Sequence, residues 1–242
     1  MQAIQDYNTM LDHYIATQSA TGRWRLKFHV EFQRMVWRWH VIGGQAAKRL
    51  LDIVASTIFL LVFSPLYLLI ALAIWLEDGR PVFFTQIRVG QFGREFRMYK
   101  FRSMCHNAEA KLQELLAKNC HSEGVTFKIK NDPRLTRVGK WLRKLSFDEL
   151  PQVWNVLKGD MSLVGPRPPV PREVAKYSVS DRRRLAVKPG ITCLWQIGGR
   201  SEIDFSGQVK LDVGYIETQS FWQDVKIIVK TVPAVASCKG AC

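Results

Sequence analysis

The strongest constraint on the fold is an uncharged apolar run at residues 53–76, which reads IVASTIFLLVFSPLYLLIALAIWL. A helix of this length can cross the ~30 Å apolar core of a bilayer. Ser64-Pro65 interrupts the run, and the proline ring clashes with the carbonyl of Leu61 while its nitrogen donates no hydrogen bond. The sequence therefore predicts a helix that bends at this point, with the Ser64 hydroxyl bonded to a carbonyl of the preceding turn.

Basic side chains flank the apolar run on both sides. They are Arg23, Arg25, Lys27, Arg34, Arg38, Lys48 and Arg49 before it, and Arg80, Arg88, Arg94, Arg97, Lys100 and Arg102 after it. Such flanks favour the cytoplasmic side of a membrane. A re-entrant helix satisfies both flanks, because each half is only ~16 Å long at about 1.5 Å per residue. A kinked helix that spans the bilayer once is the alternative that remains open.

The charge balance points to an anionic partner. The chain has 242 residues, with 35 Lys and Arg against 21 Asp and Glu, and a formal net charge of +14. The five cysteines form no C-x-x-C pair, so we expect a reducing compartment and neither a disulfide framework nor a thiolate zinc site. Residues 1–20 contain charged side chains and no long apolar run, which argues against a cleaved secretory signal.

Three regions are expected along the chain. Residues 1–47 form a basic and aromatic extension that is typical of an interfacial helix, a partner-docking helix being the alternative. Residues 48–78 hold the broken apolar helix, and residues 79–242 form a compact, mostly helical α+β domain. Within that domain we expect a hairpin around a Gly90-x-x-Gly93 turn, with Met98, Lys100 and Arg102 on one face.

Further elements are expected after the hairpin. The pattern predicts helices at residues 108–118, 137–145 and 149–157, the last ended by Gly159, and a loop at 119–131. A rigid, irregular loop is expected at 159–171, and residues 221–232 are typical of an amphipathic surface helix.

The adjacent acids Asp148 and Glu149 are the first candidates for chemistry. Pro151 limits where the following helix begins, which favours Asp148 as its N-cap, whereas an alternative frame makes Ser146 and Glu149 a capping box. Taken alone, a structural cap is the commoner role for such a pair. The same position at a helix N-terminus would also let an aspartate meet a phosphoryl group, and two carboxylates suit Mg²⁺.

Segments rich in Gly and Pro hold further basic residues. Prolines flank Arg167 in VGPRPP, and its planar guanidinium can clamp a phosphate, although a plain surface turn accounts for the same pattern. The segments KPGIT, which begins at Lys188, and WQIGGR, which ends at Arg200, indicate a tight turn, an aromatic platform and a glycine-flanked arginine, a turn with a core tryptophan being the alternative. No Walker phosphate loop, dinucleotide fingerprint or H-E-x-x-H motif is present in the sequence.

Taken in order, these segments closely resemble the bacterial sugar transferase family of monotopic phosphoglycosyl transferases. The matching segments are Lys48-Arg49-x-x-Asp52, Ser64-Pro65, PVFFTQIRVGQFGREFRMYKFRSM, DPRLTRVGKWLRKLSFDELPQVWNVLKGDMSLVGPRP, KPGITCLWQIGGR and LDVGYIETQSFWQDVKIIVKTV. The resemblance covers about residues 46–232 and leaves residues 1–45 unassigned. Thr218-Gln219 and the tail SCKGAC depart from the family pattern, but only at its periphery.

The resemblance implies a re-entrant helix in the bacterial inner membrane and a catalytic domain on its cytoplasmic face. It implies Mg²⁺, a UDP-sugar donor and undecaprenyl phosphate as acceptor, in the first membrane step of surface or exopolysaccharide assembly. Asp148 matches the family's nucleophile, and Glu149 would hold Mg²⁺ with it or act on protons. The residues carried over as phosphate contacts are Lys100, Arg143, Arg167, Lys188 and Arg200. Anionic lipid is an expected partner, and a homo-oligomer is left open.

Two other classes of function are compatible with parts of the sequence. A non-catalytic scaffold on a membrane surface would need only the basic aromatic flanks, and neither the acid pair nor Arg167. A membrane-tethered nucleic-acid binder would use the net charge and the Gly90-x-x-Gly93 loop, and a salt-sensitive RNA gel shift would detect it. The ordered motifs favour the enzyme, and no nucleic-acid partner is expected.

Overall fold

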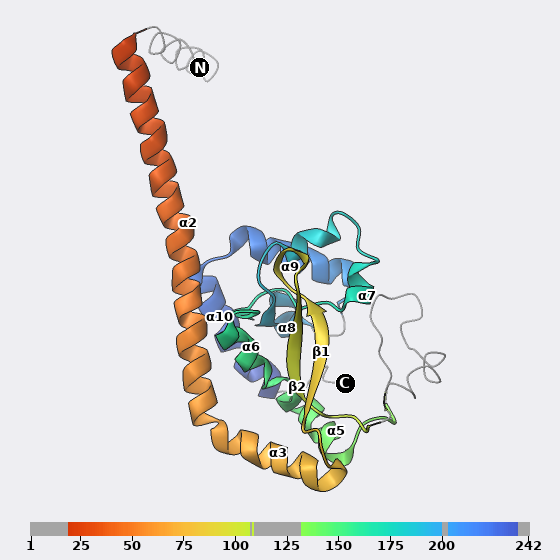
Figure 1. The fold of residues 1–242 in the computed structure, drawn as a ribbon. Helices are drawn as coiled ribbons and strands as arrows, with labels where there is room; N and C mark the ends of the chain where they lie inside the picture. The colour runs from red at the N-terminus through yellow and green to blue at the C-terminus, as the bar shows by residue number, and fades with distance from the viewer. Residues whose placement is uncertain (1–18, 107, 109–131, 200–202, 237–242) are drawn as a thin grey trace. The chain divides into compact units, whose positions relative to one another are not determined.

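The computed structural model describes residues 19–106, 108, 132–199 and 203–236. The chain divides into two compact units, Met1–Lys48 and Arg49–Cys242. The helix and loop expected at 108–131 lie outside the described residues, apart from Ala108. The described part is a mixed, helix-rich fold with one antiparallel hairpin, in agreement with the α+β expectation (Figure 1).

The described part of the first unit is helical. Helix α2 (Ala20–Val62) begins here and continues into the second unit. Trp24, Phe28 and Phe32 follow one another at intervals of four residues, so they share one face of the helix. Their rings stack with centroid separations of 5.9 Å and 6.4 Å, and all three are exposed. We call these three side chains the aromatic stripe.

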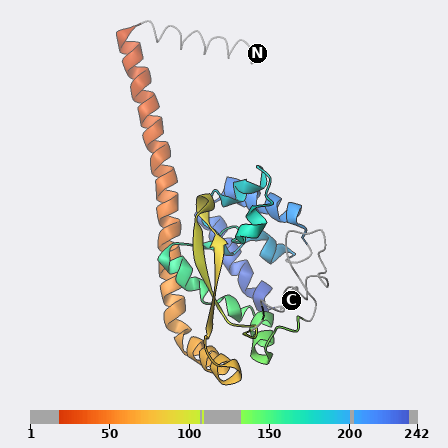
Figure 2. The same ribbon diagram turned by 45° about the vertical axis from the view of Figure 1, so that its right-hand side comes forward.

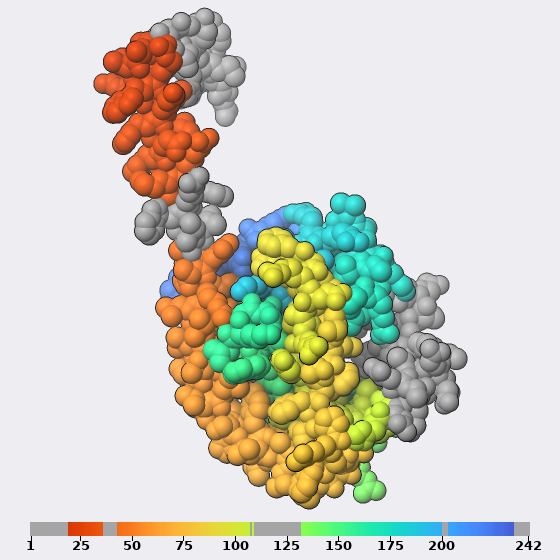
Figure 3. All heavy atoms as spheres, in the orientation of Figure 1, coloured from red at the N-terminus to blue at the C-terminus, as the bar shows by residue number. Residues whose placement is uncertain are grey.

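The predicted bend at Ser64-Pro65 is confirmed. Helix α2 ends at Val62, α3 (Ser64–Asp78) begins one residue later, and the two helices are bent by 61°. The Ser64 hydroxyl donates to the Leu61 carbonyl at 2.9 Å, as expected. Among the described residues no single helix meets the length and hydropathy expected of a membrane span, whereas Gly43–Val62 and Ser64–Asp78 meet them together. We call residues 49–78 the apolar helix pair, which is orange in Figure 3.

The predicted hairpin is confirmed as well. Strand β1 (Phe83–Val89) pairs antiparallel with β2 (Glu95–Phe101) through the short turn η1 (Gln91–Gly93), where Gly93 has φ = 81°. Directly opposed residues share a face, so Phe84, Gln86 and Arg88 lie on the same side as Lys100, Met98 and Phe96. Figure 2 shows the hairpin as the yellow ribbon of the second unit.

The acidic pair does not cap a helix, contrary to the sequence-based prediction. Helix α5 (Arg137–Lys144) matches its prediction, but Asp148 and Glu149 then lie in the 3₁₀ turn η3 (Phe147–Glu149). Helix α6 (Gln152–Lys158) begins only after Pro151 and ends at Gly159, as expected. Ser146 has φ = 58° and makes no capping hydrogen bond through its side chain, so the capping-box alternative is wrong too.

The expected irregular loop at 159–171 contains a short strand instead. Strand β3 (Ser162–Val164) pairs in parallel with β4 (Gly190–Thr192). Directly after β3 the chain stays close to β4, because Gly165 donates to the Thr192 carbonyl at 3.0 Å and Gly190 donates to the Pro166 carbonyl at 2.9 Å. A Cβ on Gly190 would lie 2.1 Å from the Gly165 nitrogen, so only glycine fits.

The C-terminal part is mostly helical. Its elements are α7 (Pro171–Val174), η4 (Asp181–Leu185), α8 (Leu194–Gly198), α9 (Phe205–Thr218) and α10 (Phe221–Ala236). Val164, Tyr215 and Ile227 form a core cluster that joins β3, α9 and α10. Helix α10 is two-faced, since Ile227 is buried whereas Trp222 and Val229 are exposed.

Candidate active site

The acidic pair lies in the short turn η3, which is held by the packing of the two residues on either side of the acids. Phe147 and Leu150, on either side of Asp148 and Glu149, pack against a cluster of Ile70, Ile74, Phe101 and Leu142. The turn's own hydrogen bonds are long, 3.3 Å from Glu149 to the Ser146 carbonyl and 3.2 Å from Leu150 to the Phe147 carbonyl. Packing from outside therefore supplies much of what fixes the two acids.

Glu149 is held by two cations from different parts of the chain. The Lys100 ammonium of β2 lies 2.7 Å from Glu149 Oε1, and Arg167 Nη1 lies 3.8 Å from the same oxygen. Burial acts to raise the pKa of Glu149, but Lys100 and Arg167 outweigh it, and the pKa falls to about 2. Glu149 is therefore ionised at neutral pH and anchors both cations.

Asp148 has a contrasting environment. It is buried, and no hydrogen-bond donor to its carboxylate is found among the described residues. Burial raises the pKa of Asp148 and the Glu149 charge adds to the effect, while Lys100, Arg143 and Arg167 oppose it. The pKa of Asp148 is thus raised while that of its neighbour Glu149 is lowered. Such a difference between adjacent carboxyl groups is frequent where one of them takes part in chemistry.

Arg167 is positioned by backbone contacts on both sides. The close contact between the backbones of Gly165 and Gly190 fixes the segment before Arg167. After it, Arg88 Nη1 donates to the Pro168 carbonyl at 2.8 Å, and the Val89 amide donates to the Pro169 carbonyl at 2.9 Å. Arg167 itself keeps 41% of its side chain exposed, so its guanidinium is both held in place and accessible.

A small cleft opens beside these charges. It is lined by Arg88, Met98, Lys100, Glu149, Gln152, Arg167, Pro168, Gly190, Ile191 and Gln196. Three lining cations, Arg88, Lys100 and Arg167, suit an anionic ligand, and phosphate is the group that such clusters bind most readily. Burial, followed by the neighbouring Arg167, lowers the pKa of Arg88 to about 10, so it stays charged at neutral pH.

Sequence reasoning missed three polar residues of this cleft, Arg88, Gln152 and Gln196. Arg88 counted only as one of many flanking charges. Its alternation with Gln86 along β1 was the available signal, because the hairpin register places both on the face of Lys100. Gln152 and Gln196 carry no comparable local pattern.

The other predicted phosphate contacts are placed differently. Arg143 Nε donates to the Ser103 hydroxyl at 3.1 Å, and its charge reaches Asp148. Lys188 lies elsewhere, because a Cβ on Gly159, at the C-terminal end of α6, would lie 3.7 Å from its ammonium. The acids precede the other end of that helix, which is roughly 10 Å long at about 1.5 Å per residue. Arg200 lies outside the described residues.

The acidic pair fits Mg²⁺ in the type of its donor atoms. No cluster of three or more His, Cys, Asp or Glu side chains is found in the part of the chain that the structure describes. Mg²⁺, however, is commonly held by one or two carboxylates together with substrate phosphates and water. A buried carboxylate such as that of Asp148, with Glu149 beside it, suits this mode of binding.

The chain belongs to the bacterial sugar transferase family, whose model matches residues 43–238. It is 52% identical over 196 residues to the galactosyl transferase CpsE of Streptococcus agalactiae, covering 81% of this chain and 43% of the relative. It is 44% identical to an undecaprenyl-phosphate galactose phosphotransferase of Salmonella typhimurium, covering 80% and 41%. It is 42% identical to the exopolysaccharide production protein ExoY of Rhizobium meliloti, covering 83% and 89%.

The chain covers very different shares of these relatives. It spans less than half the length of the first two but nearly the whole of ExoY. The aligned region holds both the hairpin and the acidic turn.

Proposed function

We propose that the chain transfers a sugar 1-phosphate from a UDP-sugar to undecaprenyl phosphate, with Asp148 as nucleophile. The observation that carries the proposal is the buried Asp148 carboxyl group, which feels the charges of Lys100 and Arg167 and precedes Glu149 at a cleft that those two cations line. Two relatives named for galactose transfer support the reaction class, and one of them is named for undecaprenyl phosphate.

The proposed reaction has two half-reactions. An Asp148 oxygen attacks the β-phosphorus of the donor, the bond from that phosphorus to the bridging oxygen breaks, and UMP leaves with that oxygen. The sugar phosphate is then held on Asp148 as an acyl phosphate. A phosphate oxygen of undecaprenyl phosphate attacks the same phosphorus, the acyl phosphate bond breaks, and the carboxylate of Asp148 is restored.

The cations of the cleft have a defined task in this scheme. Phosphoryl transfer depends mainly on positioning and on neutralising the charge of the phosphates. Lys100 and Arg167 are already fixed by Glu149, so they meet a donor without reorganising. Mg²⁺, when bound by Asp148 and Glu149, would neutralise diphosphate charge and favour the ionised form of Asp148.

We further propose that the apolar helix pair enters the cytoplasmic leaflet of the bacterial inner membrane and returns. The 61° bend, the bonded Ser64 hydroxyl and the basic flanks support this arrangement over a single span. Large apolar side chains exposed on both helices, such as Ile58, Leu68 and Leu72, would face lipid. An active site at headgroup depth would meet both a soluble donor and a lipid-anchored acceptor. Anionic lipid would then lie against the basic surface.

UMP release tests the proposal. The full chain, held in nanodiscs with Mg²⁺ and undecaprenyl phosphate, is given separate UDP-sugars, beginning with UDP-galactose. We expect UMP with at least one donor, loss of it on chelation, and sugar phosphate retained on the protein when the acceptor is omitted. Asp148→Asn should fold normally and form no UMP. Wild-type turnover in that variant would exclude the covalent route, and silence with every donor would favour the scaffold.

A further inference from the structure

A tyrosine hydroxyl of the apolar helix pair bonds the residue that directly follows the acidic turn η3. Tyr67, on the first turn of α3, donates from its hydroxyl to the Leu150 carbonyl at 2.6 Å. Leu150 follows Glu149 immediately, and its carbonyl also accepts the Val153 amide of α6 at 3.0 Å. The bond therefore meets the chain at the junction between the acidic turn and the helix that follows it.

The Tyr67 ring is fixed as firmly as its hydroxyl. It packs at a tilt against Phe101, the last residue of β2, with ring centroids 5.4 Å apart. It also borders the cluster of Ile70, Ile74, Phe101 and Leu142 that holds Phe147 and Leu150. Helix α3 thus contacts Leu150 directly through Tyr67, and it contributes Ile70 and Ile74 to the cluster against which Phe147 packs.

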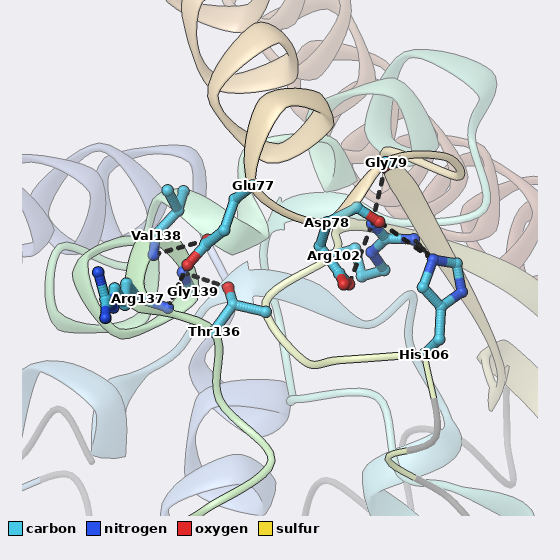
Figure 4. Close-up of polar contacts among 9 residues, drawn as sticks. All are labelled: Glu77, Asp78, Gly79, Arg102, His106, Thr136, Arg137, Val138 and Gly139. Atoms are coloured by element: carbon cyan, nitrogen blue, oxygen red, sulfur yellow. Dashed lines mark hydrogen bonds and ion pairs between the residues drawn. The ribbon is translucent and has the colours of Figure 1, made fainter.

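The far end of α3 is anchored by two sets of hydrogen bonds (Figure 4). Glu77 accepts hydrogen bonds from the amides of Arg137 and Val138, at 2.7 Å and 2.9 Å, and so caps the start of α5. Arg102, which directly follows β2, donates from Nη2 to the carbonyls of Asp78 and Gly79, both at 2.8 Å, at the end of α3. These contacts hold α3 in place against the elements that carry Lys100 and Arg143.

We propose that Tyr67 is a positioning residue for Asp148 and that α3 thereby couples the apolar helix pair to the geometry of the active site. The proposal rests on the proposed function. A 3₁₀ turn has poor hydrogen-bond geometry, and this one has internal bonds of 3.2 Å and 3.3 Å, so a 2.6 Å bond from outside restrains it strongly. Because a displacement of about 1 Å can cost ~100-fold in rate, loss of this restraint slows the attack by Asp148.

The test removes the hydroxyl and keeps the ring. Tyr67→Phe is compared with Thr57→Val, which removes a hydroxyl from the same helix pair, where Thr57 donates only to the Ile53 carbonyl of its own helix. Both full-length variants are held in nanodiscs, and UMP release is measured against donor concentration. We expect kcat of Tyr67→Phe to fall roughly tenfold with KM for the donor within about twofold, and Thr57→Val to match the wild type.

Amide hydrogen exchange supplies a second readout that does not depend on turnover. Residues 146–153 should exchange faster in Tyr67→Phe than in the wild type or in Thr57→Val. Unchanged exchange, or faster exchange with an unchanged kcat, would overturn the proposal. Wild-type chain that releases no UMP from any donor would instead overturn the proposed function, and the exchange measurement would still decide whether Tyr67 holds the turn.

Discussion

The side-chain Oδ1 of Asn155 accepts a hydrogen bond from the backbone amide of Tyr99 at 3.0 Å. The same side chain donates through Nδ2 to the Arg97 carbonyl at 2.8 Å. Asn155 lies on α6 and is fully buried, whereas Tyr99 immediately precedes Lys100 on β2. The Asn155 side chain thus takes the place of a neighbouring strand along one edge of β2. It also fixes α6, which follows the acids, to the strand that carries Lys100.

Replacement of this side chain should destabilise the fold. Asn155→Ala removes the side-chain partners of the Tyr99 amide and the Arg97 carbonyl, two partly buried hydrogen bonds, which costs about 1 to 3 kcal/mol in the free energy of unfolding. Denaturant unfolding of the detergent-held protein, followed by circular dichroism, measures the loss. Lys158→Ala, on the exposed end of the same helix, is the control and should change stability by less than about 0.5 kcal/mol. An Asn155→Ala protein as stable as the control would contradict this account.

Loss of the Lys100 charge should abolish most of the activity without removing the acids. In Lys100→Met the Glu149 carboxylate loses its nearest cation and keeps the more distant Arg167, and the cleft loses one of its cations. We expect kcat/KM for the donor to fall roughly 100-fold or more.

The matched control for this charge is Lys158→Met. Lys158 is exposed and pairs with Asp160 at the other end of α6, so its loss should leave UMP release within about twofold of the wild type. Equal activity of the two methionine variants would mean that Lys100 has no part in phosphate binding.

Local signals predicted the elements whose causes are local. Pro65 sets the bend, Gly93 ends the hairpin turn, and Gly159 stops α6 with φ = 96°. The parallel pairing of β3 with β4 could not be predicted in this way. It joins Ser162 to Gly190 through strands of three residues each, and such short segments carry no readable periodicity.

At the acidic pair the sequence predicted the wrong local structure. Pro151 indicated a helix start, and Asp148 was the nearest residue with capping chemistry. The left-handed conformation of Ser146 turns the chain early, so the acids fall in a separate 3₁₀ turn supported by tertiary contacts. Arg88 was missed for a related reason, since its approach to the cleft follows from strand register and from a contact with Pro168 eighty residues away.

Acid should weaken the segment that leads into α5. Asp132 Oδ1 accepts hydrogen bonds from the Arg134 amide at 3.0 Å and from Arg134 Nε at 2.9 Å. These bonds lower the pKa of Asp132 below its usual 3.8, against the opposing effect of burial. A lowered pKa in the folded state gives stability that is present above pH 4 and is lost as the pH falls through the folded-state value.

The corresponding variant is Asp132→Asn, which has no carboxyl group to titrate. It should be less stable than the wild type at pH 7 and should lose less stability between pH 4 and pH 2, as measured by thermal unfolding in detergent at a series of pH values. Asp204→Asn is the control, because Asn caps a helix about as well as Asp and the N-cap of α9 is kept. The same acid response in Asp132→Asn and the wild type would refute the assignment.

The aromatic stripe of α2 should dock on anionic lipid. Trp24, Phe28 and Phe32 present exposed rings along one face, and Arg25 and Lys27 stand beside them. Aromatic rings at headgroup level with cations alongside are typical of an interfacial helix, and the attraction requires lipid charge. In the full chain reconstituted in vesicles, trypsin should cut after Arg25 and Lys27 more slowly with phosphatidylglycerol present than with phosphatidylcholine alone.

Replacing the three rings by serine should remove this protection, and about 0.5 M salt should weaken it, because screening shortens the reach of the charges. Replacing Leu26 and Val30 by serine alters apolar side chains off the stripe and should leave the protection intact. Equal cleavage in both lipids would mean that the stripe binds something other than a charged bilayer. A partner protein would then be the better explanation, since exposed aromatic rings at four-residue spacing also suit a groove on another helix.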